Sequence, residues 1–202
     1  MTARRVLLEF GRPGAPSGYH FLISAVVPRP IAWISTVDRE GRPNLAPFSF
    51  FQGVSGDPPV IMVSFFPRKR SGEAKDTLSN IEETGEFVVN GVNEDLLEKV
   101  VLTSREYAHG VNEIELASLS TFPAAKVAPP CLAEAPFSLE CRREETVEIG
   151  GCRAVFGRVL CAHVREDLMD DRGRIDPRRL RPVARLGGSF YAFLGTILEK
   201  RG

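Results

Sequence analysis

The chain has 202 residues, of which 43% are hydrophobic, and its 26 basic and 26 acidic residues give a formal net charge of zero. This size and apolar content predict one compact soluble domain over residues 1–202, with a core of useful size. The balanced charge argues against a nucleic-acid partner or an anionic membrane partner. No apolar run approaches the ~18 residues of a membrane span, and no apolar segment of a signal peptide follows the first residues. We therefore expect a cytoplasmic protein.

The cysteines and histidines form no recognisable motif. The cysteines are Cys131, Cys141, Cys152 and Cys161, and the histidines are His20, His109 and His163. The cysteines contain no CxxC pair and no tight ligand spacing, and three of them lie in strand-like segments, where a buried reduced thiol is expected. The sequence therefore predicts no metal site. Among the histidines, His109 is kept as a candidate for the substrate side of a site, because it lies in an irregular loop.

The first half of the chain predicts three successive strands, at 31–37, 43–51 and 59–66. A short apolar segment at 19–26 precedes them and is either a turn of helix or a leading strand. The middle strand contains Ala46-Pro47, and proline has no N–H to donate, which confines it to edges, strand starts and bulges. We expect a bulged strand here, whose free backbone N–H groups point at something other than a neighbouring strand.

The rest of the chain adds further strands and a few short helices. The expected elements are a helix from Asp76 to about Thr84 that Gly85 ends, a strand at 87–90, a helix at 94–102 capped by Asn93, a helical turn at 112–117, a long hairpin of 137–149 and 152–164, a short helix that begins at Asp176-Pro177, and a last strand at 189–198. Many strands, few helices and no βαβ rhythm predict a mainly β protein, an antiparallel barrel with peripheral helices.

A basic loop precedes the helix that begins at Asp76. Arg68, Lys69, Arg70 and Lys75 lie within eight residues. The free N–H groups at the start of a helix, together with cationic side chains and the Thr77 hydroxyl, are typical of an anion site, and arginine can grip a phosphate with two parallel hydrogen bonds. The alternative is a solvated basic loop. A ligand with a flat polar ring at one end and a phosphate at the other could span this loop and the bulged strand.

Several motifs occur in a fixed order along the chain. They are Val27 to Thr36 (VPRPIAWIST), Asn44 to Phe51 (NLAPFSFF), Asp57-Pro58-Pro59, Lys75-Asp76-Thr77, Asn80-Ile81, Gly85 to Asn90 (GEFVVN), Pro129-Pro130, Leu139-Glu140-Cys141 and Arg185 to Tyr191 (RLGGSFY). Each is weak alone, but the ordered set resembles the flavin reductase-like family of FMN-binding split-barrel proteins, which includes the flavoredoxins. The resemblance implies an antiparallel split barrel of Greek-key type, bound FMN, and a homodimer with the flavin near the subunit interface.

The resemblance also implies a set of cofactor-binding residues. The backbone of Ala46, Pro47, Phe48 and Ser49 would meet the polar edge of the flavin ring, with Asn44 adjoining. Arg70, Lys75 and Thr77 would bind the phosphate, and Ser64 would add a hydroxyl. Trp33, His109, Arg185 and Tyr191 are candidate neighbours of the flavin or the substrate. For Trp33 the alternative is a core aromatic, and for Tyr191 the preceding glycines fit either a close backbone approach or a simple turn.

The implied chemistry needs no catalytic side chain. In flavin reduction the cofactor carries the electronic work, and the protein supplies orientation and hydrogen bonds. The first hypothesis is therefore an FMN-dependent oxidoreductase that takes hydride from NAD(P)H and reduces a flavin or a small substrate. A flavoredoxin-type carrier that passes electrons between protein partners is the alternative, and a related split-barrel oxidase is a third, weaker one. No GxGxxG motif is present, which removes a Rossmann site but not nicotinamide stacked on an exposed flavin.

Overall fold

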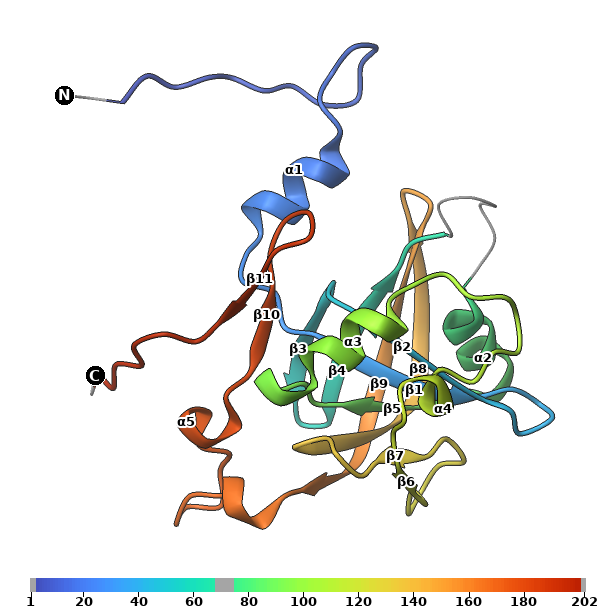
Figure 1. Ribbon diagram of the computed structural model, residues 1–202. Helices are drawn as coiled ribbons and strands as arrows, with labels where there is room; N and C mark the ends of the chain where they lie inside the picture. The colour runs from blue at the N-terminus through green and yellow to red at the C-terminus, as the bar shows by residue number, and fades with distance from the viewer. Residues whose placement is uncertain (1–2, 68–74, 201–202) are drawn as a thin grey trace.

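The computed structural model describes residues 3–67 and 75–200. Its centre is a seven-stranded antiparallel sheet in the order β2-β1-β5-β8-β9-β4-β3 (Figure 1). The strands are β1 (Ala32–Val37), β2 (Pro43–Phe48), β3 (Phe51–Gly56), β4 (Pro59–Phe65), β5 (Glu86–Asn90), β8 (Phe137–Ile149) and β9 (Cys152–Val164). The mainly β, antiparallel fold that the sequence predicts is thus confirmed.

Short elements surround this sheet. The helices are α1 (Gly18–Ala25), α2 (Asp76–Thr84), α3 (Leu97–Thr103), α4 (Glu113–Leu116) and α5 (Pro177–Leu180), with the 3-10 turns η1 (Glu94–Leu96) and η2 (Glu166–Leu168). Two small hairpins pair β6 (Thr121–Phe122) with β7 (Cys131–Leu132), and β10 (Val183–Arg185) with β11 (Tyr191–Phe193). No helix within 3–67 and 75–200 is long and apolar enough to span a membrane.

The sheet closes on itself because its two end strands are consecutive in the chain. Only Ser49 and Phe50 connect β2 to β3, and two residues reach no further than about 7 Å. The Phe48 ring of β2 packs against the Phe65 ring of β4, with centroids 4.6 Å apart, and the Ser64 N–H donates to the Phe50 carbonyl at 2.9 Å. These contacts hold the connection against β4, so the sheet curls into a barrel.

The two faces of β1 supply two hydrophobic clusters. Ala32 and Ile34 belong to a cluster that includes Leu78 and Ile81 of α2. Trp33 alternates with them and packs on the other side, in a cluster that includes residues of α3 and α4. Because both faces are covered, every residue of β1 is buried. Strand β1 is therefore a central wall, with α2 on one side and α3 and α4 on the other.

The predicted bulge in 43–51 is wrong. Residues 43–48 pair with β1 in an unbroken register, and the chain instead breaks at Ser49-Phe50 before it enters β3. The physical reason is that β2 is an edge strand. The Leu45 N–H points away from β1, toward Glu113, so by the alternation of a strand Pro43 and Pro47 also face outward, where no ladder hydrogen bond is lost.

Most other expected elements are confirmed, several of them with changed bounds. Helix α2 has the predicted bounds and ends at Gly85, whose φ of 74° is left-handed, and the β8–β9 hairpin also has the predicted bounds. The segment at 19–26 is a helix, α1. The helix at 94–102 begins as η1 before α3, and the strand at 189–198 is only Tyr191–Phe193, paired with the unpredicted β10.

Gly157 of β9 provides a test of the barrel packing. A Cβ built on Gly157 would lie 2.4 Å from Cζ of Phe87, which is fully buried. We predict that Gly157→Ala lowers the free energy of unfolding by about 1–3 kcal/mol, because Phe87 has no room to move away. Gly53→Ala in β3 is the matched control, since nothing lies within 4 Å of its added Cβ. Equal denaturation midpoints for the two variants would contradict this packing.

Candidate functional site

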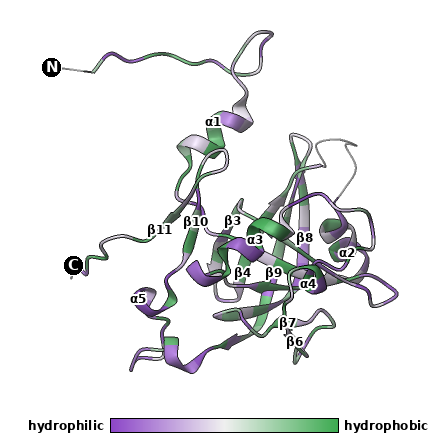
Figure 2. Ribbon diagram, in the orientation of Figure 1, coloured by the Kyte–Doolittle hydropathy of each residue, from purple (hydrophilic) through white to green (hydrophobic). Residues whose placement is uncertain are grey.

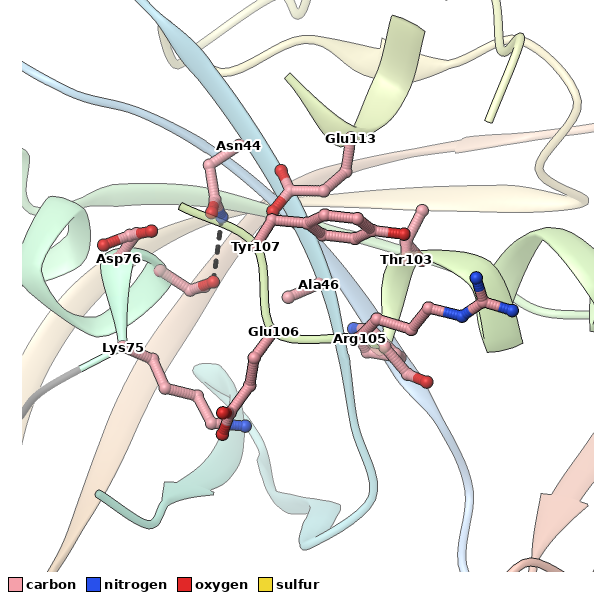
Figure 3. Close-up of a pocket in the computed structure, with 12 residues that line it drawn as sticks. Asn44, Ala46, Lys75, Asp76, Thr103, Arg105, Glu106, Tyr107 and Glu113 are labelled. Atoms are coloured by element: carbon pink, nitrogen blue, oxygen red, sulfur yellow. Dashed lines mark hydrogen bonds between the residues drawn. The ribbon is translucent and has the colours of Figure 1, made fainter. Parts of the chain in front are cut away.

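A hollow of about 470 Å³ lies between β2, the start of α2 and the segment that follows α3. Asn44, Ala46 and Pro47 line it from β2, and residues 75–77 line it from α2. Residues 103–107 and Glu113 complete the wall, and Figure 3 shows the labelled residues arranged around one space. This volume includes space open to solvent, so the hollow is an open depression in the surface.

A buried hydrogen-bond network joins β2 to α2 at this hollow. The Asn44 side-chain amide donates to Thr77 Oγ1 at 2.8 Å and to Thr36 Oγ1 at 3.3 Å. Asn80 of α2 donates to the same Thr36 oxygen at 3.0 Å. All four side chains are buried, so the start of α2 is held in a fixed position relative to β2. The Asn44 amide group thus works as a structural link as well as lining the hollow.

The start of α2 presents groups suited to an anion. The first N–H groups of a helix have no partner within the helix, and the helix dipole makes this end positive. Thr77 accepts a hydrogen bond from Asn44, and a hydroxyl has one proton of its own to donate. Lys75 Nζ lies 5.0 Å from the centroid of the Phe48 ring. Asp76 adds a carboxylate beside this end, and His109 Nδ1 lies 3.1 Å from its Oδ1.

The outer edge of β2 presents mainly acceptors. Glu113 of α4 is buried, and its Oε2 accepts the Leu45 N–H at 3.0 Å. Since Pro43 and Pro47 carry no N–H, the groups left on this edge are carbonyl oxygens. The expectation of several free N–H groups within β2 is therefore wrong, and the edge instead suits a ligand that donates a hydrogen bond.

Trp33 exposes no surface to a ligand within this chain. Its side chain is fully buried, and its indole N–H donates to Thr103 Oγ1 at 2.9 Å. Thr103 in turn lines the hollow. The expectation that Trp33 neighbours the ligand is corrected accordingly: it is a core aromatic that positions one residue of the wall.

The side chains of several other expected residues do not line the hollow. Phe48 is buried in the barrel core, and the Ser64 hydroxyl donates to Met62 Sδ at 3.4 Å. Ser49 accepts from Arg29 Nε at 3.4 Å. Arg185 stacks on the Tyr191 ring, 4.4 Å from its centroid, in the β10–β11 hairpin. Within this chain these side chains are thus not part of the wall.

The remaining expected residues are brought together or lie outside the described part of the chain. Asn44, Ala46, Pro47, Lys75 and Thr77 all line the hollow, as expected from the ordered motifs. His109 lies next to it through its contact with Asp76. Arg70, with Arg68 and Lys69, lies outside the described residues.

The wall formed by 103–107 and Glu113 was not expected from the sequence. Its first part contains Ser104-Arg105-Glu106-Tyr107, a compact polar run beside a helix end. Such a run is also common in ordinary surface loops, so its position on the site required the fold.

Arg29 was also missed, and it ties the two ends of the chain to the barrel. Its guanidinium donates to the carbonyls of Ile23 at 2.6 Å and Val26 at 2.8 Å, at the end of α1. It also donates to the Leu186 carbonyl at 2.9 Å, next to the β10–β11 hairpin. A Cβ on Gly187 would lie 2.9 Å from Ser24 Oγ. The close approach that this glycine permits is therefore the approach of α1.

The comparisons with known proteins decide the family. A model of the flavin reductase like domain matches residues 24–179. The chain belongs to the flavin reductase-like family. An uncharacterized protein of Aquifex aeolicus is 39% identical over 173 residues, which cover 86% of this chain and 88% of that protein. This membership supports a flavin-related oxidoreductase.

Solved structures of this fold agree. The structure of nitrilotriacetate monooxygenase component B from Bacillus cereus is 34% identical, with a TM-score of 0.89 over 98% of this chain and 100% of that one. The 2-nitrobenzoate 2-nitroreductase NbaA of Pseudomonas fluorescens is 28% identical, with a TM-score of 0.82 over 96% and 95% of the two chains. Both are similar to this chain along nearly their whole length.

Proposed function

We propose that the hollow binds FMN and that the protein is a reductase in which NAD(P)H delivers hydride to the flavin. The observation that carries this proposal is the Asn44–Thr77 hydrogen bond, which fixes an acceptor-rich strand edge beside a helix start. A phosphate suits the helix start, and a ring N–H suits the strand edge. FMN has both groups, one at each end of a single molecule.

The residues at the helix start would bind the phosphate. The first N–H groups of α2 and the Thr77 hydroxyl would donate to phosphate oxygens, and Lys75 would add a positive charge. Asp76 opposes this charge, and its Oδ1 lies 3.1 Å from His109 Nδ1. Because Asn44 already occupies one acceptor site of the Thr77 oxygen, the hydroxyl proton is free to turn toward the ligand.

The residues of the strand edge would orient the ring. The outward carbonyl of Pro47, which lines the hollow, would accept the ring imide N–H, and Glu113 keeps this stretch of backbone in place. The flavin supplies the hydride acceptor, N5. The chain supplies binding and orientation, and no side chain needs to transfer a proton for hydride to pass between nicotinamide and flavin.

The reductase is favoured over an electron carrier by the solved structures with more than 25% identity. They are named as a monooxygenase component and a nitroreductase, which belong to enzyme systems. The flavoredoxin of Desulfovibrio vulgaris is 22% identical, and this likeness concerns the fold alone. The substrate that receives the electrons downstream is a flavin or a small organic molecule in this proposal.

A second copy of the chain would complete the protein as a homodimer. The N-terminal arm (residues 3–27) and the C-terminal arm (residues 183–200) extend from the barrel (Figure 1), and Figure 2 shows apolar stretches along both. Their exposed large apolar side chains include Leu7 at 86%, Phe190 at 71% and Leu198 at 73% exposed. An exposed apolar surface of this kind is typical of a protein interface.

Reduction by nicotinamide tests the proposed activity. We expect the purified protein, reconstituted with FMN, to show the spectrum of oxidised flavin and to bleach rapidly when mixed anaerobically with NADH or NADPH. A flavin-loaded protein that only a protein donor reduces would instead support the carrier. A protein that cannot be loaded with FMN would contradict both hypotheses.

Sedimentation velocity tests the proposed dimer. We expect a mass of two chains for the full-length protein, because pairing would bury the apolar arms. Replacement of Leu7 and Phe193 by aspartate should shift the protein to the mass of one chain while its circular dichroism remains unchanged. The control is Ile149→Asp, which changes an exposed residue at the tip of the β8–β9 hairpin. A wild-type monomer would contradict the dimer.

A further inference from the structure

Three side chains with metal-binding atoms meet on the side of the sheet covered by β6 and β7. Cys131 lies on β7, Glu140 on β8 and His163 on β9. The thiol sulfur, a carboxylate oxygen and a ring nitrogen all lie within 4.8 Å of one another. The sequence shows no metal motif here because the donors come from three strands that only the fold brings together. This cluster is separate from the proposed flavin site, whose lining contains none of these residues.

The cluster places an acidic group in a fully buried position. Glu140 and Cys131 have no solvent exposure, while the His163 side chain is 35% exposed. Cys161 is the cross-strand partner of Glu140 on β9, although it lies outside the group of three donors. A second thiol is therefore close to the cluster, and the exposed face of His163 leaves a route from solvent.

Hydrogen bonds from outside the cluster already orient its donors. The backbone N–H groups of Ala125 and Lys126 donate to the Glu140 carboxylate at 2.7 Å and 2.6 Å. The His163 ring meets the Phe122 ring edge-on, with centroids 5.2 Å apart. Such supporting contacts fix ligand orientation in metal sites. The same contacts join the segment 121–132 to the sheet, so an ion here would strengthen that attachment.

The dimensions fit a small, thiophilic divalent cation. In zinc sites the metal lies about 2.0–2.3 Å from sulfur, nitrogen and oxygen ligands in a tetrahedral arrangement, which puts the ligand atoms roughly 3–4 Å apart. At present His163 Nε2 donates to Glu140 Oε1 at 2.6 Å. To admit the ion, these two atoms need to separate by about 1 Å, which a rotation of the half-exposed imidazole provides.

We propose that Cys131, Glu140 and His163 form a binding site for Zn²⁺, with Cys161 or a water molecule as the fourth ligand. On binding, the Cys131 thiol releases its proton to solvent and His163 presents an unprotonated Nε2, so the ion replaces the His163–Glu140 hydrogen bond. The bound ion strengthens the attachment of the segment 121–132 to the sheet. It does not depend on whether the protein binds flavin.

Cobalt and zinc binding to the chelator-treated full-length protein tests the site. Co²⁺ bound by a thiolate absorbs in the near ultraviolet, and tetrahedral Co²⁺ absorbs in the visible range. We expect one equivalent of Co²⁺ per chain with both signals, their loss on addition of Zn²⁺, and a higher melting temperature with Zn²⁺. Cys131→Ser should abolish the thiolate band and weaken Zn²⁺ binding by about 100-fold or more, because even the loss of a group that only supports a ligand costs about 10- to 100-fold.

Matched variants separate the site from chance binding. Cys152→Ser is the control, since Cys152 is a free, partly buried thiol at the start of β9 and lies outside the cluster. It should bind like the wild type. Because Glu140→Gln could fail to fold, His163→Asn is the second test, and it should lose tetrahedral Co²⁺ absorption. Absence of binding by the wild type, or unchanged binding by Cys131→Ser and His163→Asn, would overturn the proposal.

Discussion

The connection between β2 and β3 is the constraint on which the rest of the structure depends. These strands lie at opposite ends of the sheet order, yet only Ser49 and Phe50 separate them. A connection this short brings the two end strands together, so the sheet closes. Closure fixes which edge of β2 stays unpaired, and this is the edge that faces α4 and the start of α2. The candidate site is therefore a consequence of how the barrel closes.

The site combines a rigid framework with a wall from irregular chain. The network of Asn44, Thr36, Thr77 and Asn80 is buried and links strand to helix. The wall at 103–107 is held at one end by the Trp33–Thr103 hydrogen bond, which begins in the core. Buried hydrogen bonds that are fully satisfied make such a frame stiff. A stiff frame suits a cofactor whose chemistry needs orientation more than it needs reactive side chains.

The sequence was sufficient for the fold and for part of the site. Helix α2 with Gly85 at its end and the long hairpin of 137–149 and 152–164 are predicted by local signals, and both have the predicted bounds. The ordered motifs likewise located Asn44, Pro47, Lys75 and Thr77, which now line one hollow. Pro47 was misinterpreted because the sequence does not tell which side of a strand faces its neighbour.

Sequence patterns do not predict contacts between distant segments of the chain. Arg29 donates to carbonyls at both ends of the chain, and nothing in its neighbours shows this. The same applies to Glu113, which accepts a backbone N–H 68 residues away, and to the donors gathered around Glu140. In each case a polar side chain is buried against backbone from another element, and only the tertiary fold specifies the partner.

The central claim is that the start of α2 and the edge of β2 hold the two ends of one FMN molecule. The most direct measurement compares the affinities of FMN and riboflavin for the wild type, for Lys75→Ala and for the control Lys99→Ala, whose lysine binds the Ser118 carbonyl elsewhere. We expect Lys75→Ala to weaken FMN about 10- to 100-fold, the worth of one charged hydrogen bond, and to leave riboflavin and the control unchanged. Equal losses for FMN and riboflavin, or no loss for either, would contradict the claim.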